Sequence, residues 1–454
     1  MTYPSPGREA RGVAPLLDLE PWFIPGLLQT RSRVFQTSSI DAPGTLGPRL
    51  GRSVVCWRDL ARSTEFRSKL KARLGLSRTA VNRAILAIRT MLISSPRTSF
   101  AELSPRSARS VLVALAMFIL FCLAVSQSEL RNKHLENVRD GGGADIRLYE
   151  AEVTRMRQGE SYYHVAGEEL RARGFPTRSV FNWRLPLLFQ LIAAPPSLWF
   201  ARLTLGGLAV TVLALSFRIL EREAGSRAAL GGTLLTVGAL LPAFLGVGYL
   251  LPDVWSATLI ALCLCAFGVN RLALGVVAGV ASLFAREQGG LCCVIGLALA
   301  ARRRAWPEVV GWSAGLALYA TYFAWHAWMV SGLTGEHELA HREGWIQFSG
   351  APFVIAACQM NCLLLLLPQW VTCLYFPLAL LGFASWRTKF AERSGLVAAW
   401  YLIAFAIVGQ PFNQYWGVLI APVLAWGFAR APAALRDLWH AARWSERIAS
   451  PNLA

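Results

Sequence analysis

Two aspartates flank three glycines in a short polar segment, Asp140-Gly-Gly-Gly-Ala-Asp145. The segment lies in the mixed-charge stretch 128–184, which separates the first long apolar run of the chain from the next one. Ionisable residues held at a membrane edge usually serve a function. Glycines let the backbone approach a ligand closely, although they also form simple turns. This stretch is therefore the first candidate site, and the alternative is that both aspartates are solvated loop residues.

Four more polar residues border or interrupt apolar runs. Arg286 and Glu287 break an apolar hairpin, Asp253 follows a Leu-Pro pair, and Tyr415 precedes the last apolar run. Ionisable groups at such a depth are costly, so they usually line a cavity or pair with each other. The membrane crossings predicted below put all of them on the same side as Asp145. Their convergence on one cavity is a hypothesis that the sequence alone does not decide.

The segment His337-Glu338-Leu-Ala-His341 has the spacing of a zinc-protease motif. Two histidines four residues apart share a helix face and can hold zinc, while the glutamate activates water. However, Gln347 stands where the longer form of the motif has a third histidine. The short loop 331–352 also leaves no room for a strand that would hold a peptide substrate. A membrane zinc metalloprotease is therefore the less favoured interpretation, and a solvated helical turn is the simpler one.

The composition is that of a multi-pass membrane protein. Hydrophobic residues make up 54% of the chain and charged residues 16%, and the mean hydropathy is +0.41. Spans in lipid must be helices, because their backbone groups have to pair internally. The predicted fold class is all-α, with about ten or eleven transmembrane helices and a long first extracytoplasmic loop that contains short amphipathic helices. Residues 110–430 form the predicted transmembrane domain, and residues 431–454 a cytoplasmic tail.

The apolar runs predict spans at about 110–127, 199–217, 229–250, 254–270, 272–286, 289–301, 309–330, 353–369, 371–386, 395–410 and 417–430. The loops around Arg302 and Arg387 are basic, as is the segment after Arg430, whereas the loops 250–253 and 411–416 contain no Lys or Arg and the loop 331–352 contains only Arg342. The positive-inside rule places the basic loops in the cytoplasm and residues 128–184 outside. One of the two apolar runs between 352 and 387 should then be re-entrant or interfacial, because parity requires an odd number of crossings there.

The N-terminal region, residues 1–109, contains no span and holds 18 Lys or Arg against 7 Asp or Glu. It is predicted to be cytoplasmic and partly disordered, with a basic amphipathic helix over 59–93 that lies on the membrane surface. Residues 70–85 are weakly similar to a helix-turn-helix, but nucleic acid is the less favoured partner. A third interpretation is that translation begins at Met91.

The spacing of several residues carries a resemblance to a known family. Asp145 follows the first span, Tyr149 comes four residues later, and a Gly-x-x-Tyr element follows at 159–162. Together with the apolar run after Arg184-Leu-Pro186, this pattern resembles the GT-C superfamily of membrane glycosyltransferases, especially its polyprenyl-phosphate-mannose-dependent branch. The resemblance covers about residues 110–430.

The resemblance implies that a hexose such as mannose is transferred, with inversion, from a polyprenyl-phosphate donor to an acceptor at the extracytoplasmic face. Such a reaction needs a carboxylate to take the proton of the acceptor hydroxyl, and cations to hold the phosphate leaving group. Asp145 matches the acidic position of the family and is the predicted base, with Asp140 as the reserve. Arg147 and Arg184 are predicted to bind the phosphate, because a guanidinium matches phosphate oxygens. The alternative for Arg184 is an arginine that extends to the membrane interface.

The predicted substrate-binding set is completed by Tyr149, Asp253, Arg286, Glu287 and Tyr415. No metal site is assigned, because the outer loop lacks the adjacent acidic pair that many members of the resembled family carry. A divalent metal is left open as a cofactor. The acceptor is a glycan, a lipid or a protein, and membrane lipids are further partners. The alternative function is a multi-pass transporter or lipid flippase, which would be expected to show internal repeats with broken helices.

Overall fold

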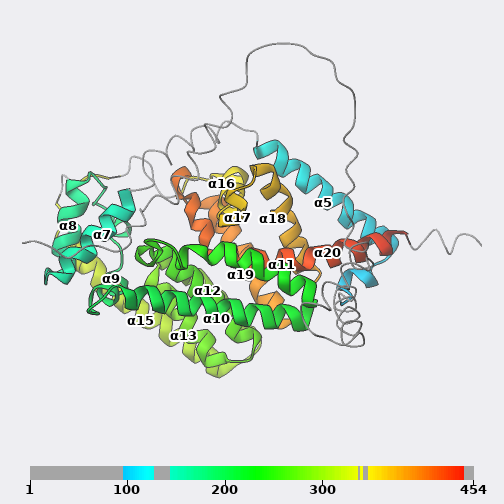
Figure 1. The fold of residues 1–454 in the computed structure, drawn as a ribbon, viewed down its shortest axis with the longest axis horizontal. Coiled ribbons are helices and arrows are strands. Elements are labelled where there is room, and N and C mark those ends of the chain that lie inside the picture. The colour runs from blue at the N-terminus through cyan, green and yellow to red at the C-terminus, as the bar shows by residue number, and fades with distance from the viewer. Residues whose placement is uncertain (1–95, 127–143, 336–337, 341–345, 444–454) are drawn as a thin grey trace, which may run out of the picture. The chain divides into compact units, whose positions relative to one another are not determined.

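The computed structural model describes residues 96–126, 144–335, 338–340 and 346–443 (Figure 1), which all belong to the unit 47–454 of the chain. In these ranges the protein is helical and has no β-strand, which confirms the all-α prediction. The helices are α5 (Pro105–Ser126), α7 (Ala144–Arg157), α8 (Tyr162–Ala172), α9 (Pro186–Ala193), α10 (Trp199–Ala224), α11 (Ser226–Leu240), α12 (Pro252–Gly268), α13 (Leu272–Ala285), α14 (Gly290–Arg302), α15 (Trp306–Ser331), α16 (Gly350–Cys358), α17 (Cys362–Leu365), α18 (Gln369–Ala384), α19 (Lys389–Ile407) and α20 (Ala421–Arg443). Short 3-10 helices are η1 (Ser99–Glu102), η2 (Val180–Asn182), η3 (Leu241–Ala243), η4 (Gly248–Leu250), η5 (Glu287–Gly289) and η6 (Pro411–Leu419).

Three helices of the described ranges, α5, α10 and α19, are long and apolar enough to cross a membrane. The pair formed by η6 and α20 is bent by 64° and would count as a fourth span if it crosses as one unit. Large apolar side chains are exposed on these elements, including Met117 and Phe121 on α5 and Leu203 and Val210 on α10. Exposed apolar surface of this kind indicates contact with lipid or with a partner. The larger number of ten or eleven spans stays a prediction.

The apolar run 353–369 does not form the single span that its hydropathy predicts. It is divided into α16 and α17, and Asn361 lies at the break. The Asn361 side chain accepts a hydrogen bond from the Leu363 amide (3.0 Å) and donates one to the Leu235 carbonyl of α11 (2.8 Å). A buried polar side chain thus replaces helical hydrogen bonds. The expectation that one run between 352 and 387 is not a straight crossing fits this break, while α18 is the continuous helix of the two.

The last helix extends beyond the predicted boundary at residue 430. It continues through Pro432 to Arg443, so the first part of the predicted tail is helical. Before it, η6 packs against α16 at Gly417, where an added Cβ would lie 1.8 Å from the Ala357 carbonyl oxygen. Only glycine permits the two backbones to approach so closely.

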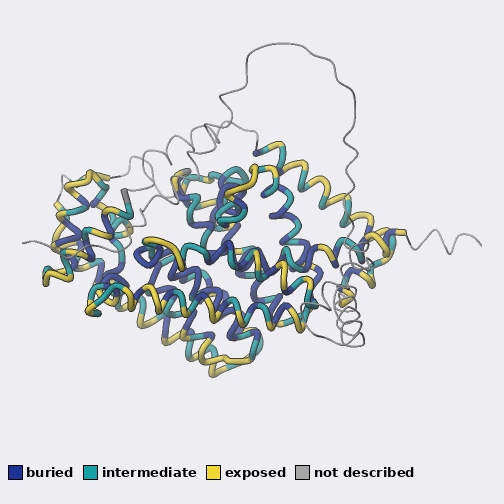
Figure 2. The backbone as a smooth tube through the Cα atoms, in the orientation of Figure 1, coloured by how far each residue is buried: buried dark blue, intermediate teal, exposed yellow. Residues whose placement is uncertain are grey.

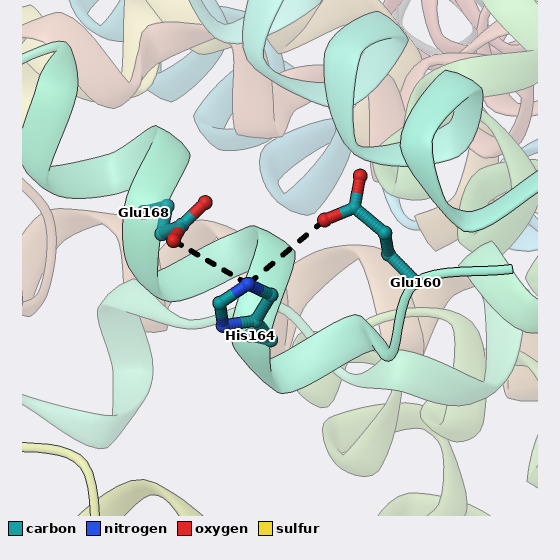
Figure 3. Close-up of side chains that lie close together, drawn as sticks. All are labelled: Glu160, His164 and Glu168. Carbon is teal, nitrogen blue, oxygen red and sulfur yellow. Dashed lines mark ion pairs between the residues drawn. The ribbon is translucent and has the colours of Figure 1, made fainter. Parts of the chain in front are cut away.

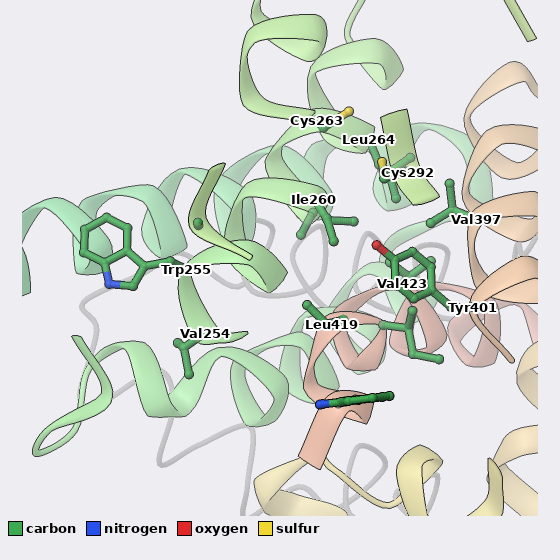
Figure 4. Packing of buried hydrophobic residues seen from close by; sticks show 14 of the residues in the cluster. Val254, Trp255, Ile260, Cys263, Leu264, Cys292, Val397, Tyr401, Leu419 and Val423 are labelled. Carbon is green, nitrogen blue, oxygen red and sulfur yellow. The ribbon is translucent and has the colours of Figure 1, made fainter. Parts of the chain in front are cut away.

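The core lies around α12, in which nearly every residue is buried (Figure 2). Figure 4 shows Cys263 of α12, Cys292 of α14, and Val397 and Tyr401 of α19 packed close together. The Tyr401 hydroxyl donates a hydrogen bond to the Gln288 carbonyl (2.7 Å). The cysteines of this core are free and buried, as expected for small hydrophobic side chains.

The turns that follow α10, α12, α14 and α18 meet at one end of the helices, which we call the basic end. Arg222 donates to the Gly268 carbonyl (3.1 Å), and the Thr388 hydroxyl donates to Glu223 (2.7 Å). Arg303 pairs with Glu392 at 2.6 Å. The basic loops that the sequence grouped on one side of the membrane therefore lie together, which leaves the N-terminus of α12 and the C-terminus of α13 at the other end.

Candidate functional site

The first side of the site is α7, which packs against α8 and α9 (Figure 1). Asp145 lies in the first turn of α7, and Tyr149 and Glu152 follow four and seven residues later on the same helix face. Tyr149 and Glu152 are buried, and Asp145 is half-buried. Arg147 is exposed and lies two residues after Asp145, on another side of the helix. The predicted phosphate contact of Arg147 therefore has no support from its position.

Arg184 is held beside α7 and α8 by hydrogen bonds that join its carbonyl oxygen and its guanidinium group to tyrosines of these helices. Its carbonyl accepts a hydrogen bond from the Tyr162 hydroxyl (2.5 Å), and its Nε donates to the Tyr149 hydroxyl oxygen (2.7 Å). Pro186, in the first turn of α9, fixes the chain just after it. The two terminal nitrogens of Arg184 make no hydrogen bond to any residue that the structure describes, so they can bind an added oxyanion.

The second side of the site is formed where α12 begins and α13 ends. Asp253 lies in the first turn of α12, Arg286 follows α13, and Glu287 begins η5. The Arg286 guanidinium is 3.1 Å (Nε) from Asp253 Oδ1 and 3.5 Å (Nη1) from Glu287 Oε1. These two ion pairs do not satisfy it: its Nε and Nη1, as well as Asp253 Oδ1, are buried without a hydrogen-bond partner in the described part of the chain. Only 2% of Arg286 is exposed.

The two sides face each other. Asp145 interacts electrostatically with Arg184, Asp253 and Arg286, and the two arginines interact with each other. Tyr415 of η6 interacts electrostatically with the same four charged residues. We call this group the polar cluster; it consists of Asp145, Tyr149, Arg184, Asp253, Arg286, Glu287 and Tyr415. The structure therefore brings together every predicted site residue except Arg147, and except Asp140, which lies outside the described residues.

Burial changes the acidity of the carboxyl groups on α7. Burial raises the pKa of Asp145, and so does Asp253, while Arg184 and Arg286 oppose this rise. Burial also raises the pKa of Glu152 to about 8, although Arg184 acts in the opposite direction. A carboxyl group with a raised pKa is a stronger base once it has lost its proton.

Glu152 is the group that the sequence prediction missed. It is 2% exposed, and its Oε2 has no hydrogen-bond partner among the described residues. Its place three residues after Tyr149 puts it on the face of α7 that carries Asp145. A helix over residues 144–157 would have placed Glu152 on the face of Asp145, but its burial depends on contacts that local spacing does not give.

Glu338 of the zinc-protease motif has a structural contact. Its carboxylate accepts hydrogen bonds from Arg171 Nε (3.0 Å) and Nη2 (2.7 Å), and from the Thr177 hydroxyl. These bonds hold the pKa of Glu338 below its usual value and connect its loop to α8. The carboxylate therefore has protein partners that give it a structural role. His337 and His341 lie outside the described residues.

A second group with metal-ligand chemistry lies on α8 and the turn before it (Figure 3). His164 Nε2 is 3.9 Å from Glu160 and 3.4 Å from Glu168. Arg155 already pairs with the carboxylates of this group: it donates to Glu160 (2.8 Å from Nε), to Glu168 (2.7 Å) and to the neighbouring Glu169 (3.2 Å). The arginine takes the place that a cation would need, so the polar cluster remains the candidate site.

The chain was compared with protein-family models, with curated proteins and with solved structures, and none of them matches it. The function of the polar cluster therefore has to be inferred from its own residues and geometry.

Proposed function

We propose that the protein is a membrane glycosyltransferase that moves a hexose from a polyprenyl-phosphate donor to an acceptor hydroxyl. The observation that carries this proposal is the pairing, in one cluster, of a half-buried carboxyl group with two arginines whose guanidinium groups are only partly hydrogen-bonded (Arg184) or not hydrogen-bonded (Arg286) within the described residues. Buried polar groups are normally satisfied, so unsatisfied guanidinium groups indicate a site for an absent anion. A lipid phosphate has the charge and the oxygens that such a site binds.

Asp145 is the proposed base. The acceptor oxygen attacks the anomeric carbon of the donor, and its proton passes to Asp145. The bond between that carbon and the phosphate oxygen breaks, and the electron pair leaves with the polyprenyl phosphate. The raised pKa of Asp145 favours its role as a proton acceptor.

Arg184 and Arg286 are proposed to hold the phosphate. The two guanidinium groups repel each other, so an anion between them would relieve a cost that the free protein bears. Tyr149 orients Arg184 through the 2.7 Å hydrogen bond to its Nε, which leaves the terminal nitrogens for the ligand. Tyr415 supplies a hydroxyl for the sugar, and Asp253 and Glu287 hold Arg286 in place.

The membrane arrangement forms part of the proposal. With the basic end in the cytoplasm, the polar cluster faces the extracytoplasmic side, and the N-terminus is cytoplasmic. Several helices expose apolar side chains that suit contact with lipid. The donor chain would then lie in the membrane beside the cluster, with its phosphate between the arginines.

The test is sugar transfer by the full chain and by Asp145→Asn, reconstituted with polyprenyl-phosphate hexoses and a lipid extract as acceptor. The variant should lose about 10²–10⁴-fold in rate, because it lacks the base, while it still binds the lipid phosphate. Glu150→Gln is the matched control, since Glu150 is exposed on the same helix. Equal rates for wild type and Asp145→Asn would contradict the role of Asp145, and no transfer from any donor would contradict the proposed function.

A transporter or lipid flippase is the second candidate, and broken helices favour it. The α16–α17 break and the bent η6–α20 pair lie on elements that pack against each other, since η6 contacts α16. Discontinuous helices that pack together are typical of transporter binding sites. Movement of a fluorescent polyprenyl phosphate across proteoliposomes, without any sugar transfer, would favour this candidate over the transferase.

A further inference from the structure

The charges around the site do not balance for an anionic ligand. The polar cluster and Glu152 together contain four carboxyl groups and two guanidinium groups, which would give a net charge of −2 if all were ionised. A phosphate would be repelled by such a site. Each proton on one of these carboxyl groups lowers the repulsion, and one proton brings the net charge to −1, so protonation of a carboxyl group close to an arginine favours phosphate binding.

Glu152 is the carboxyl group best placed to keep its proton. Asp145 has to be ionised to act as a base, and Asp253 and Glu287 each lie within 3.5 Å of the Arg286 guanidinium. Glu152 has no ion pair within the described ranges, and only 2% of it is exposed. A buried carboxylate without a partner costs several kcal/mol, so the neutral acid is the favoured form.

The groups around Glu152 leave one cation that could attract it. From α8, it is faced by Tyr162, Glu169 and Arg173, and the last two already pair with each other at 2.7 Å. From the segment before α9 it is faced by Arg184, the charge that acts on it most strongly. If Glu152 lost its proton, its negative charge would therefore be compensated mainly by Arg184.

We propose that Glu152 is a positioning residue that stays protonated at neutral pH and so leaves the charge of Arg184 free for a lipid phosphate. Loss of the proton neutralises Arg184 and releases the ligand, so the site binds phosphate less well in alkaline solution. This inference rests on the proposed function, because it assumes that the ligand of Arg184 is a phosphate. The rise in the pKa of Glu152 to about 8 places the change just above neutral pH.

The experiment measures binding of a short-chain polyprenyl phosphate to the full chain in nanodiscs of neutral lipid, across a range of pH. Wild-type affinity should fall about tenfold between roughly pH 7 and pH 9, whereas Glu152→Gln should keep its affinity, because the amide cannot ionise. A phosphate monoester is already dianionic over most of this range, so its own charge changes little. Arg184→Gln should bind weakly throughout, and Glu150→Gln should follow the wild type.

The variants separate failure of the inference from failure of the proposed function. If wild type binds and Arg184→Gln does not, yet Glu152→Gln shows the same fall as wild type, Glu152 has no such role and the proposed function stands. If wild type does not bind the lipid phosphate, both ideas are wrong. If Arg184→Gln binds as well as wild type, Arg184 is not the phosphate ligand and the inference is wrong.

Infrared difference spectra give a measurement that needs no ligand. Wild type minus Glu152→Gln at pH 7 should contain the C=O band of a protonated carboxylic acid, which should be replaced by carboxylate bands at alkaline pH. Carboxylate bands alone at pH 7 would show that Glu152 is ionised there, and the proposal would be wrong.

Discussion

Arginines at the two ends of the helices differ in their hydrogen bonds. At the basic end, Arg303 is hydrogen-bonded to Glu392, and Arg393 donates to Glu308 (3.1 Å) while its guanidinium lies 3.4 Å from the centre of the Phe267 ring. At the other end, Arg286 is equally buried but has two ion contacts without a hydrogen bond.

This difference in hydrogen bonding distinguishes arginines that stabilise the fold from an arginine that could bind a ligand. A buried arginine that serves packing gains hydrogen bonds and aromatic contacts within the protein. Arg393 also has one nitrogen, Nη1, without a partner, but Arg286 makes no hydrogen bond at all within the described residues, and a partner that the folded chain does not supply would explain this. Substitutions at matched arginines should therefore change activity at one end and stability at the other.

The largest effect is expected for Arg286→Gln. Removal of one of the two cations should lower sugar transfer about 10²–10³-fold, because the leaving phosphate loses a charged donor. The elution of the variant on size exclusion in detergent should match that of wild type. A transfer rate near that of wild type would remove Arg286 from the site.

Arg393→Met should affect stability instead. The substitution leaves the half-buried Glu308 without its ion pair to the buried Arg393, and it should lower the free energy of unfolding by about 3 kcal/mol. Thermal unfolding in detergent measures this change, and transfer per folded molecule should stay at the wild-type value. A loss of transfer without a loss of stability would contradict the structural role of Arg393.

Tyr149→Phe is expected to have a smaller effect on transfer. The variant removes the oxygen that accepts the hydrogen bond of Arg184 Nε, and a bond to a charged group is worth about 1.5 kcal/mol, or roughly tenfold in kcat/KM. The Tyr162→Phe variant is a useful comparison, because it removes the hydrogen bond to the Arg184 carbonyl instead. Unchanged kcat/KM in Tyr149→Phe would show that Arg184 is oriented by other contacts.

The smallest effect is expected for Arg147→Gln. Arg147 is exposed and lies on another side of α7 than Asp145, so transfer should stay within about twofold of wild type, as for an exposed surface charge. The same assay applied to Arg184→Gln gives the contrast. A large loss in Arg147→Gln would restore the sequence prediction that this residue binds phosphate.

Hydropathy and loop charge were sufficient to predict part of this arrangement. The apolar runs that become α12 and α13 are bounded by Pro252 and Arg286, and parity placed Asp253 and Arg286 at the same end. The structure brings these two residues into contact.

Two features escaped the sequence for physical reasons. Averaged hydropathy hides Asn361, whose hydrogen bond to Leu235 joins residues 126 positions apart and divides a run that looks like one span. Glu152 was missed because its significance depends on burial by α8 and on the position of Arg184. Neither relation can be derived from local spacing alone.

Gly417 has a consequence for the site that its own chemistry does not suggest. It lies two residues after Tyr415, in a 3-10 helix whose backbone touches Ala357. Any larger residue there would push this helix away from its neighbour and carry the tyrosine with it. A random screen for loss of activity should therefore recover position 417 together with the charged residues, although it offers no functional group to a ligand.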